Sequence, residues 1–231
     1  MTRPDTLHGL EIPYSKSVDE LVKLTKETAP LCWAAYTALG FHNSDKSIEA
    51  LTSLLANQDW THKRSAIEAI GNNENGLRLE SQLIDSLNDS NKFVVSAAIK
   101  SLSNLGSKKA HDKIKSLIGS ENVEIQHAAI EGLSGLFEQN DFNFLIDFYK
   151  VSAKESTRKK IGFVLAIHID ESNWKMFFDT FSKDSIIRHR EWALTSAINF
   201  SKDKTFIEKF LTDTDGHIRK MAKRFAGQGC A

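Results

Sequence analysis

The chain has 231 residues, of which 41% are hydrophobic and 26% charged, a composition typical of a globular protein that can bury a sizeable core. Its 30 Lys and Arg residues equal its 30 Asp and Glu residues, and this neutrality argues against a protein that coats nucleic acid over its whole length. The charge is uneven, because residues 1–149 carry 14 basic and 20 acidic residues (14 − 20 = −6), whereas residues 150–231 carry 16 and 10 (16 − 10 = +6).

Cysteine use and hydropathy favour a reducing, aqueous compartment. Cys32 and Cys230 stand near opposite ends of the chain, which makes a disulfide framework implausible. No apolar run approaches 18 residues, and no short apolar segment follows Met1. We therefore expect a cytoplasmic protein that is neither exported nor inserted in a membrane.

The first 16 residues contain two of the three prolines, Pro4 and Pro13, and have no helical period. We expect an extended N-terminal arm over residues 1–16 that lies over the first repeat or is partly disordered. Ser17 and Glu20 form the spacing of a capping box and predict the start of the first helix. Pro30 suits the first turn of the second helix, where its missing N–H has no partner to lose.

From this point a repeat can be followed to the end of the chain. Each unit has a polar turn, then a helix with a small residue at its centre and, in most units, an aliphatic residue four places on. The central positions are separated by 31, 32, 31, 32, 32 and 29 residues, and they are Ala35, Ala66, Ala98, Ala129, Ile161, Ala193 and Ala222. A period of this size predicts a solenoid in which each unit buries its apolar face only against its neighbours.

A second row of apolar residues recurs at the same period, one in the helix that precedes each central position: Leu21, Leu51, Leu83, Ile114, Leu145, Phe177 and Ile207. The chain is thus predicted to form seven pairs of an outer and an inner helix. The predicted outer helices are 18–26, 47–55, 77–87, 110–118, 142–151, 173–181 and 205–211. The predicted inner helices are 30–39, 61–70, 93–105, 124–137, 157–168, 187–200 and 217–226. Gly40, Gly71 and Gly106 follow or end inner helices and predict left-handed C-caps.

The run from Asp213 to Ala222, Asp-Thr-Asp-Gly-His-Ile-Arg-Lys-Met-Ala, resembles the Asp-x-Asp-x-x-Val-Arg-x-x-Ala core of HEAT-type repeats. It is most similar to the short repeats of bacterial HEAT-like and phycobilin-lyase-like proteins. The resemblance implies an all-α, right-handed α-solenoid, a single repeat domain over residues 17–228 with a tail at 229–231, and inner helices that line the concave surface. The position of the family's arginine holds Cys32, Lys63, Val95, Gln126, Arg158, Arg190 and Arg219, so the ladder of Asp–Arg pairs between repeats is expected to be incomplete.

The inner-helix surface is the strongest candidate for a binding site. Residues two places before and after each central position face away from the buried stripe. The candidate binding residues on this surface are Arg64, Lys100, His127, Lys159, Phe163, Arg188, Lys220 and Arg224. Their C-terminal members are mostly basic and could hold an acidic peptide or a phosphate backbone, or could pair with neighbouring carboxylates. Most other phenylalanines fall at helical spacing on outer helices and predict core packing.

No motif indicates a catalytic, metal-binding, nucleotide-binding or cofactor-binding site. The segment from Arg158 to Leu165 is similar to one in bacterial HEAT-like alkylpurine DNA glycosylases, which implies that Phe163 occupies the place of a lesion-contacting aromatic. The essential carboxylate of those enzymes has no counterpart in residues 93–98. We therefore predict a non-catalytic scaffold that binds a protein partner in its groove. The alternatives are nucleic-acid backbone binding through the basic C-terminal half, and an accessory role in chromophore attachment.

Overall fold

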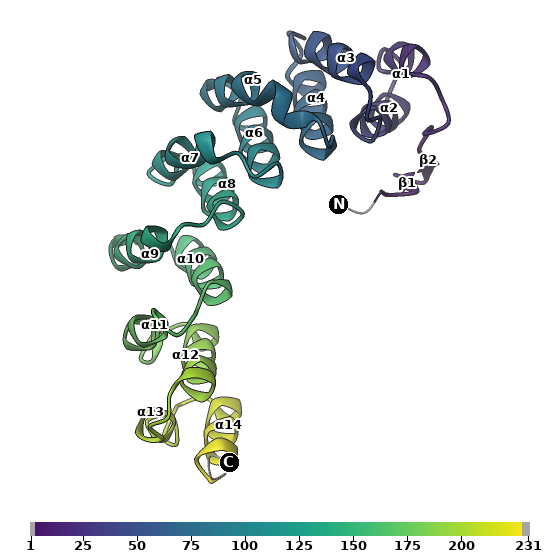
Figure 1. The fold of residues 1–231 in the computed structure, drawn as a ribbon. Helices are drawn as coiled ribbons and strands as arrows, with labels where there is room; N and C mark the ends of the chain where they lie inside the picture. Colours follow the sequence, from purple (N-terminus) through teal and green to yellow (C-terminus); the bar gives the residue numbers. More distant parts are fainter. Residues whose placement is uncertain (1–2, 228–231) are drawn as a thin grey trace. The chain divides into compact units, whose positions relative to one another are not determined.

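A computed structural model describes residues 3–227 of the chain, and Figure 1 shows its elements in chain order. The described residues form 14 α-helices and one two-stranded antiparallel sheet, which confirms the predicted all-α repeat fold. They divide into two compact units, one ending at Phe137 and one beginning at Glu138. Cys230 and the predicted tail at 229–231 lie outside the described residues. Within them, no helix has both the length and the apolarity to cross a bilayer.

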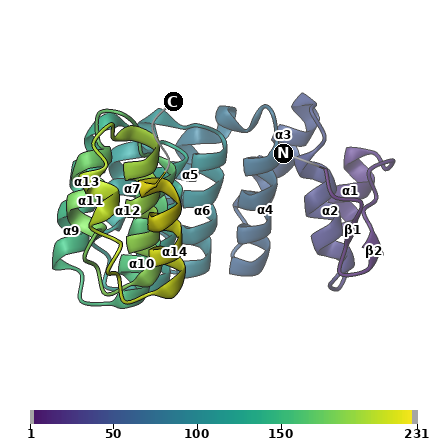
Figure 2. The same ribbon diagram turned by 90° about the horizontal axis from the view of Figure 1, so that it is seen from below.

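Unit 1, residues 3–137, contains the sheet and four helix pairs. Its elements are β1 (Thr6–Leu7), β2 (Leu10–Glu11), α1 (Val18–Leu24), α2 (Leu31–Gly40), α3 (Asp45–Leu55), α4 (Trp60–Asn72), α5 (Glu80–Asp85), α6 (Lys92–Asn104), α7 (His111–Leu117) and α8 (Val123–Ser134). Short 3-10 segments flank α5 and precede α7. The inner helices α2, α4, α6 and α8 each pack against the next, and Figure 2 shows α4 and α6 side by side.

Unit 2, residues 138–227, contains three helix pairs. Its elements are α9 (Gln139–Val151), α10 (Glu155–Ile167), α11 (Trp174–Phe181), α12 (Ile187–Phe200), α13 (Thr205–Glu208) and α14 (Gly216–Ala226). The inner helices α10, α12 and α14 pack in succession. All predicted inner helices are present, with small differences at their ends. The outer helix α13 spans only four residues and is shorter than the predicted helix over 205–211.

Polar turns set the starts of the inner helices α4, α6, α8 and α14. Asp59 Oδ1 accepts a hydrogen bond from the backbone N–H of Thr61 at 2.8 Å, and Asp215 Oδ1 accepts one from His217 at 2.9 Å. Asn91 and Asn122 cap α6 and α8 in the same way. Each such cap stabilises a helix by about 1 kcal/mol. The Asp or Asn of the repeated turn therefore has a direct structural role, and the predicted capping box of Ser17 begins α1.

Both predicted apolar rows lie in the core. All seven central residues of the inner helices are 0% exposed, as are all members of the outer row except Ile207, which is 7% exposed. Because these helices are short and marginal alone, packing between neighbouring pairs supplies their stability. The periodicity thus identified the residues that hold the repeats together.

The glycine caps are a correction to the sequence-based prediction. Of the three, only Gly106 has a left-handed backbone, with φ 68°. Gly40 and Gly71 lie within α2 and α4, where the helices approach too closely for a side chain. A Cβ on Gly40 would lie 2.7 Å from the backbone oxygen of Ala69, and one on Gly71 would lie 2.8 Å from Cα of Ser101. These two glycines allow close contact between inner helices and do not terminate them.

The N-terminal arm contains a β-hairpin that the sequence did not predict. His8 and Gly9 form its turn with φ values of 50° and 79°, and both strands contact α2. Ile12 is buried at 3% exposure, and the hydroxyl of Tyr14 donates to the carbonyl oxygen of Pro4 at 2.7 Å. Strands of two residues have no readable alternation of polar and apolar residues, so this hairpin could not be identified from periodicity.

Candidate functional site

A pocket of about 410 Å³ lies in unit 1 between the β-hairpin, α2 and α4. The residues that line it are Leu7, His8, Trp33, Tyr36, Thr37, Trp60, Thr61, Arg64, Ser65, Glu68, Ala69 and Asn72. The hairpin supplies one edge, α2 supplies the indole of Trp33, and α4 supplies a stripe of residues along its length. The pocket therefore depends on three elements that are distant in the sequence.

Aromatic rings form one end of the pocket. Trp33 and Trp60 are each 40% exposed, and the imidazole of His8 lies 5.7 Å from the Trp33 ring, centroid to centroid. The hydroxyl of Tyr36 lies 3.1 Å from Nδ1 of His62, and burial raises the pKa of Tyr36 to about 12. Tyr36 thus stays protonated at neutral pH, and it lines the pocket together with the two indoles.

Polar side chains follow the pocket along α4. Arg64, Glu68 and Asn72 are four residues apart in succession, so they lie on one face about one turn from each other. Arg64 Nε donates to Glu68 Oε1 at 2.8 Å, and the two side chains are 45% and 44% exposed. Among the described residues, the Nη atoms of Arg64 and the Oε2 atom of Glu68 have no hydrogen-bond partner. They remain available to a ligand.

The aromatic surface continues from the pocket onto the next inner helices. The rings of Trp60 and Phe93 stack at 5.3 Å with an interplanar angle of 25°. Lys92 Nζ lies 5.0 Å from the centre of the Phe93 ring and 2.5 Å from Oε2 of Glu124. We call Trp33, Trp60 and Phe93 the aromatic row. It crosses α2, α4 and α6 near the N-terminal ends of these helices.

The predicted binding residues of unit 1 do not gather at one place. Arg64 lines the pocket. Lys100 is exposed on α6 and His127 is half-buried on α8, and neither lines the pocket. The prediction started its outward positions at the second repeat. Trp33 stands two places before Ala35, so the same rule applied to the first repeat would have found it.

In unit 2, two predicted binding residues, Phe163 and Arg188, both lie near the ring of Trp192. The Phe163 side chain is 53% exposed and its ring lies 6.2 Å from that of Trp192. The guanidinium of Arg188 lies 5.5 Å from the Trp192 ring and donates to Glu191 at 2.8 Å. Trp192, which the binding-site prediction omitted, is therefore the centre of this group.

The other predicted cations of unit 2 lie on α10 and α14. Lys159 pairs with Glu155 at 2.6 Å, while Lys220 and Arg224 are exposed on α14. The guanidinium of Arg224 lies 5.6 Å from the Phe225 ring. Because Lys159 and Arg188 already have carboxylate partners, this surface gives nucleic-acid binding no support.

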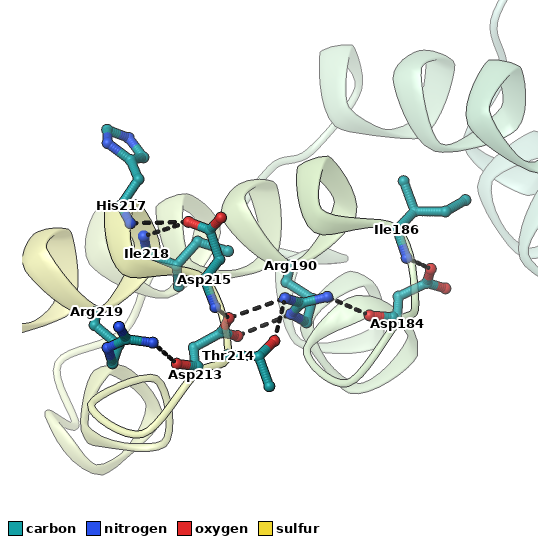
Figure 3. A network of polar contacts seen from close by, with 9 residues as sticks. All are labelled: Asp184, Ile186, Arg190, Asp213, Thr214, Asp215, His217, Ile218 and Arg219. Carbon is teal, nitrogen blue, oxygen red and sulfur yellow. Dashed lines mark hydrogen bonds and ion pairs between the residues drawn. The ribbon is translucent and has the colours of Figure 1, made fainter.

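Ion pairs between successive repeats form an incomplete ladder. In unit 2, Arg190 binds Asp213 of the next turn through two hydrogen bonds, Nε–Oδ2 at 2.8 Å and Nη2–Oδ1 at 2.9 Å (Figure 3). Its Nη1 atom also donates to the carbonyl oxygen of Asp184 at 2.8 Å. The pair is nearly buried, with exposed fractions of 10% and 6%. The hydrogen bond from Arg190 holds the pKa of Asp213 below its usual value, so both groups stay charged.

The corresponding pair of unit 1 is weaker. Lys63 Nζ lies 2.5 Å from Oδ2 of Asp89, but the two side chains are 28% and 14% exposed and share a single contact. The next ladder position holds Val95, a buried apolar residue that cannot form an ion pair. At the position after it, Gln126 turns to its own loop and donates to the carbonyl oxygen of Ile118 at 3.0 Å. The expectation of an incomplete ladder is therefore met at Val95 and Gln126.

A second buried polar cluster of unit 2 involves His189, which is 1% exposed. Its Nδ1 atom lies 3.2 Å from the hydroxyl of Tyr149 and 3.5 Å from Oδ1 of Asp184, and the Tyr149 hydroxyl donates to the Asp184 carboxylate. Among the described residues its Nε2 atom has no partner, and it faces Gly162. Burial lowers the pKa of His189, which keeps the ring neutral near pH 7. No cluster of His, Cys, Asp or Glu in residues 3–227 has the composition of a metal site.

Stacked helix pairs with a buried small-residue seam and partial ion-pair ladders between repeats define a helical repeat scaffold. The comparisons agree, since residues 49–134 match the family model for HEAT repeats. Residues 49–134 are therefore HEAT-like repeats.

Similarity to individual proteins is confined to the fold. No curated protein matches the sequence. The structure is similar to a chain in the complex of CpcE and CpcF of phycocyanin lyase from Nostoc sp. PCC7120, with 13% identity, 98% of each chain covered and a TM-score of 0.56. A crystal structure of an engineered protein has 17% identity over 91% of this chain and 95% of that chain, with a TM-score of 0.45.

Proposed function

We propose that this protein is a non-catalytic interaction scaffold that binds a segment of a protein partner on its inner helices. The observation that carries the proposal is the aromatic row of unit 1, with Trp33 and Trp60 each 40% exposed beside a pocket of about 410 Å³. Tryptophan and arginine dominate the binding energy of protein interfaces, and both stand here on rigid helices. Large apolar side chains grouped on a surface are a sign of a binding site.

The exposed cations of unit 2 have a supporting part in this proposal. Lys159, Arg188, Lys220 and Arg224 lie in the region of positive net charge and would speed encounter with an acidic partner. Since Lys159 and Arg188 are already paired, their contribution to affinity is small compared with that of the aromatic row. A cytoplasmic setting, suggested by cysteine use, belongs to the same proposal.

The test is quantitative affinity capture from cell extract with three forms of the full chain. These are the wild type, the double variant Trp33→Ala/Trp60→Ala, and the control Leu77→Ala, which removes another exposed apolar side chain of unit 1. A partner that binds the aromatic row should be retained by the control and lost by the double variant. With the purified partner, each tryptophan substitution should weaken binding about 30-fold or more. Equal capture by all three folded forms would refute the proposal.

An accessory role in chromophore attachment is a second candidate. The observation that favours it is the pair of indoles in the pocket, which could stack on a planar conjugated molecule. Co-expression with a chromophore and an acceptor protein tests it by absorbance. A coloured product that depends on Trp33 and Trp60 would support this role, and a colourless acceptor would exclude it.

A further inference from the structure

We infer that the pocket between α2 and α4 binds an uncharged, extended peptide segment of the partner. The main chain of this segment lies along Arg64, Glu68 and Asn72, and one aromatic side chain enters between Trp33 and Trp60. The inference rests on the proposed function and specifies which chemistry the partner presents. The length of the pocket, the spacing of the polar side chains on α4 and the neutral charge of the Arg64–Glu68 pair each support this inference.

The pocket is elongated along α4. It extends from Thr61 to Asn72, and at about 1.5 Å per residue these positions are about 16 Å apart. An extended segment of about five residues, which rises about 3.3 Å per residue, spans this length.

The polar side chains match the repeat of an extended main chain. Residues four apart on a helix are about 6 Å apart along its axis, which is the spacing of Arg64, Glu68 and Asn72. In an extended peptide, groups that point to the same side recur every two residues, or about 6.6 Å. Three successive polar side chains of α4 can thus meet successive peptide groups on one side of the segment.

Charge complementarity favours a neutral segment. Arg64 and Glu68 neutralise each other through their 2.8 Å hydrogen bond. The pair still offers the Nη donors of Arg64 and the Oε2 acceptor of Glu68. A peptide group has one acceptor and one donor and can use both without breaking the pair. A lysine or aspartate side chain would have to compete with an existing partner of opposite charge.

The aromatic residues at one end of the pocket determine which side chain of the peptide binds there. The rings of His8 and Trp33 are inclined at 57°, so they present both a face and an edge to a ligand. Trp60 is held from its other side by stacking on Phe93. Aromatic rings prefer edge-to-face or offset contacts, which this arrangement offers to a phenyl or phenol ring.

The probe is the peptide acetyl-Gly-Ser-Phe-Ser-Gly-Ser-amide, titrated into the full chain and followed by calorimetry and tryptophan fluorescence. Saturable binding is expected. N-methylation of the two peptide nitrogens that follow Phe should weaken binding at least about tenfold, because it removes the donors for Glu68. Replacement of Phe by Gly or by Lys should weaken it by a similar factor.

Protein variants complete the test. Glu68→Ala should weaken binding of the peptide about fivefold or more, Glu68→Gln, which keeps a single acceptor oxygen for Arg64 and the peptide to share, should weaken it less, and Glu74→Ala, an exposed carboxylate outside the pocket, should have no effect. Circular dichroism shows whether each variant is folded. The inference is overturned if the N-methylated peptide binds equally well, if acetyl-Phe-amide binds as tightly as the hexapeptide, or if the Lys peptide binds better than the Phe peptide.

The experiments distinguish a failure of the proposed scaffold function from a failure of the extended-segment inference. If the double tryptophan variant loses a captured partner but none of the peptides binds, the scaffold function stands and the extended-segment inference is wrong. If the peptides bind as expected but the double variant captures the same proteins as the wild type, the pocket binds peptide and the proposed scaffold function is wrong.

Discussion

The two units use one repeat pattern to build different interiors and different surfaces. In unit 1 the core is mainly aliphatic, and Trp33, Trp60 and Phe93 remain partly exposed on inner helices. In unit 2 the outer helices carry the aromatic residues inward, so that Phe177, Phe178 and other rings are fully buried. The phenyl rings of Phe177 and Phe181 lie 4.5 Å apart, and Phe178 contacts Phe206 and Phe210 edge to face.

Helix length does not account for this difference. The outer helices α1, α5 and α7 of unit 1 span seven, six and seven residues, and α11 and α13 of unit 2 span eight and four. The difference lies in the residues that these helices carry, because large rings bury more apolar area per residue than aliphatic side chains. Buried polar networks around Arg190 and His189 add directional contacts between loops and helices. Unit 2 thus buries several rings of its outer helices in the core, whereas unit 1 leaves Trp33, Trp60 and Phe93 partly exposed on its inner helices.

The largest expected effect comes from the buried ion pair of unit 2. Arg190→Ala leaves the carboxylate of Asp213 buried without its partner and should lower the free energy of unfolding by about 3–5 kcal/mol. The matched change in unit 1, Lys63→Ala, breaks a more exposed single contact and should cost about 1 kcal/mol. Urea unfolding followed by circular dichroism measures both. Equal losses of unfolding free energy in the two variants would show that the two ion pairs stabilise their units to the same extent.

Close packing of inner helices gives the next effect. A Cβ on Gly162 would lie 2.7 Å from Cδ2 of the buried His189 ring, so Gly162→Ala should destabilise unit 2 by about 1–3 kcal/mol. Gly216→Ala is the control, because the nearest atom to its added Cβ is 3.7 Å away. Thermal unfolding of the two variants should therefore differ, with Gly216→Ala close to the wild type. Similar midpoints would show that the ring of His189 can move aside.

Lowering the pH should reduce the folding stability of unit 2, and His189 is the group responsible. Burial lowers the pKa of this imidazole against the opposing effect of Asp184, and the nearby cations Arg158 and Lys159 lower it further. The unfolded chain then binds a proton that the folded chain does not. Stability is therefore lost as the pH falls below about 6.5, by at most about 1.4 kcal/mol per pH unit.

The measurement is the urea midpoint between pH 7.5 and pH 5, with the fluorescence of Trp174 and Trp192 reporting on unit 2 and that of Trp33 and Trp60 on unit 1. Variants that retain only one pair of tryptophans separate the signals. His189→Asn removes the titrating ring and should flatten the pH dependence of the unit 2 signal. An unchanged slope in this variant would assign the effect to another group.

The smallest effects are expected for exposed pairs within single helices. Arg64–Glu68 in unit 1 and Lys159–Glu155 in unit 2 are both exposed i,i+4 pairs. Arg64→Ala and Lys159→Ala should each change the free energy of unfolding by about 0.5 kcal/mol or less. A larger loss for Arg64→Ala would mean that this side chain supports the pocket wall as well as offering donors to a ligand. Denaturant titration of both variants in parallel tests this point.

Several features of the molecule could be predicted from the sequence because they are local and repeated. The period identified the central alanines from Ala35 to Ala222, and the structure buries every one of them. The Asp or Asn before an inner helix predicted where that helix begins, since a cap needs only a side chain and the next two or three backbone N–H groups. Helix order and pairing were therefore encoded in the spacing of residues along the chain.

The candidate site was predicted only in part. Arg64 was expected on the ligand-facing side and lines the pocket, but the indole of Trp33 and the β-hairpin were not expected there. The pocket joins Leu7, Trp33 and Asn72 from three elements, and no local pattern specifies such a meeting. In unit 2, Tyr149, Asp184 and His189 likewise come from different elements and meet only in the packed structure.

The sequence by itself determined the repeat, the helix pairs and the buried seam, because each follows from side-chain period and from capping over a few residues. The tertiary structure alone decided which exposed aromatics adjoin a pocket, which glycines separate helices, and which ion pairs are buried. These depend on distances between side chains of different repeats. Such distances are set when neighbouring pairs pack, and the spacing of residues within one repeat does not contain them.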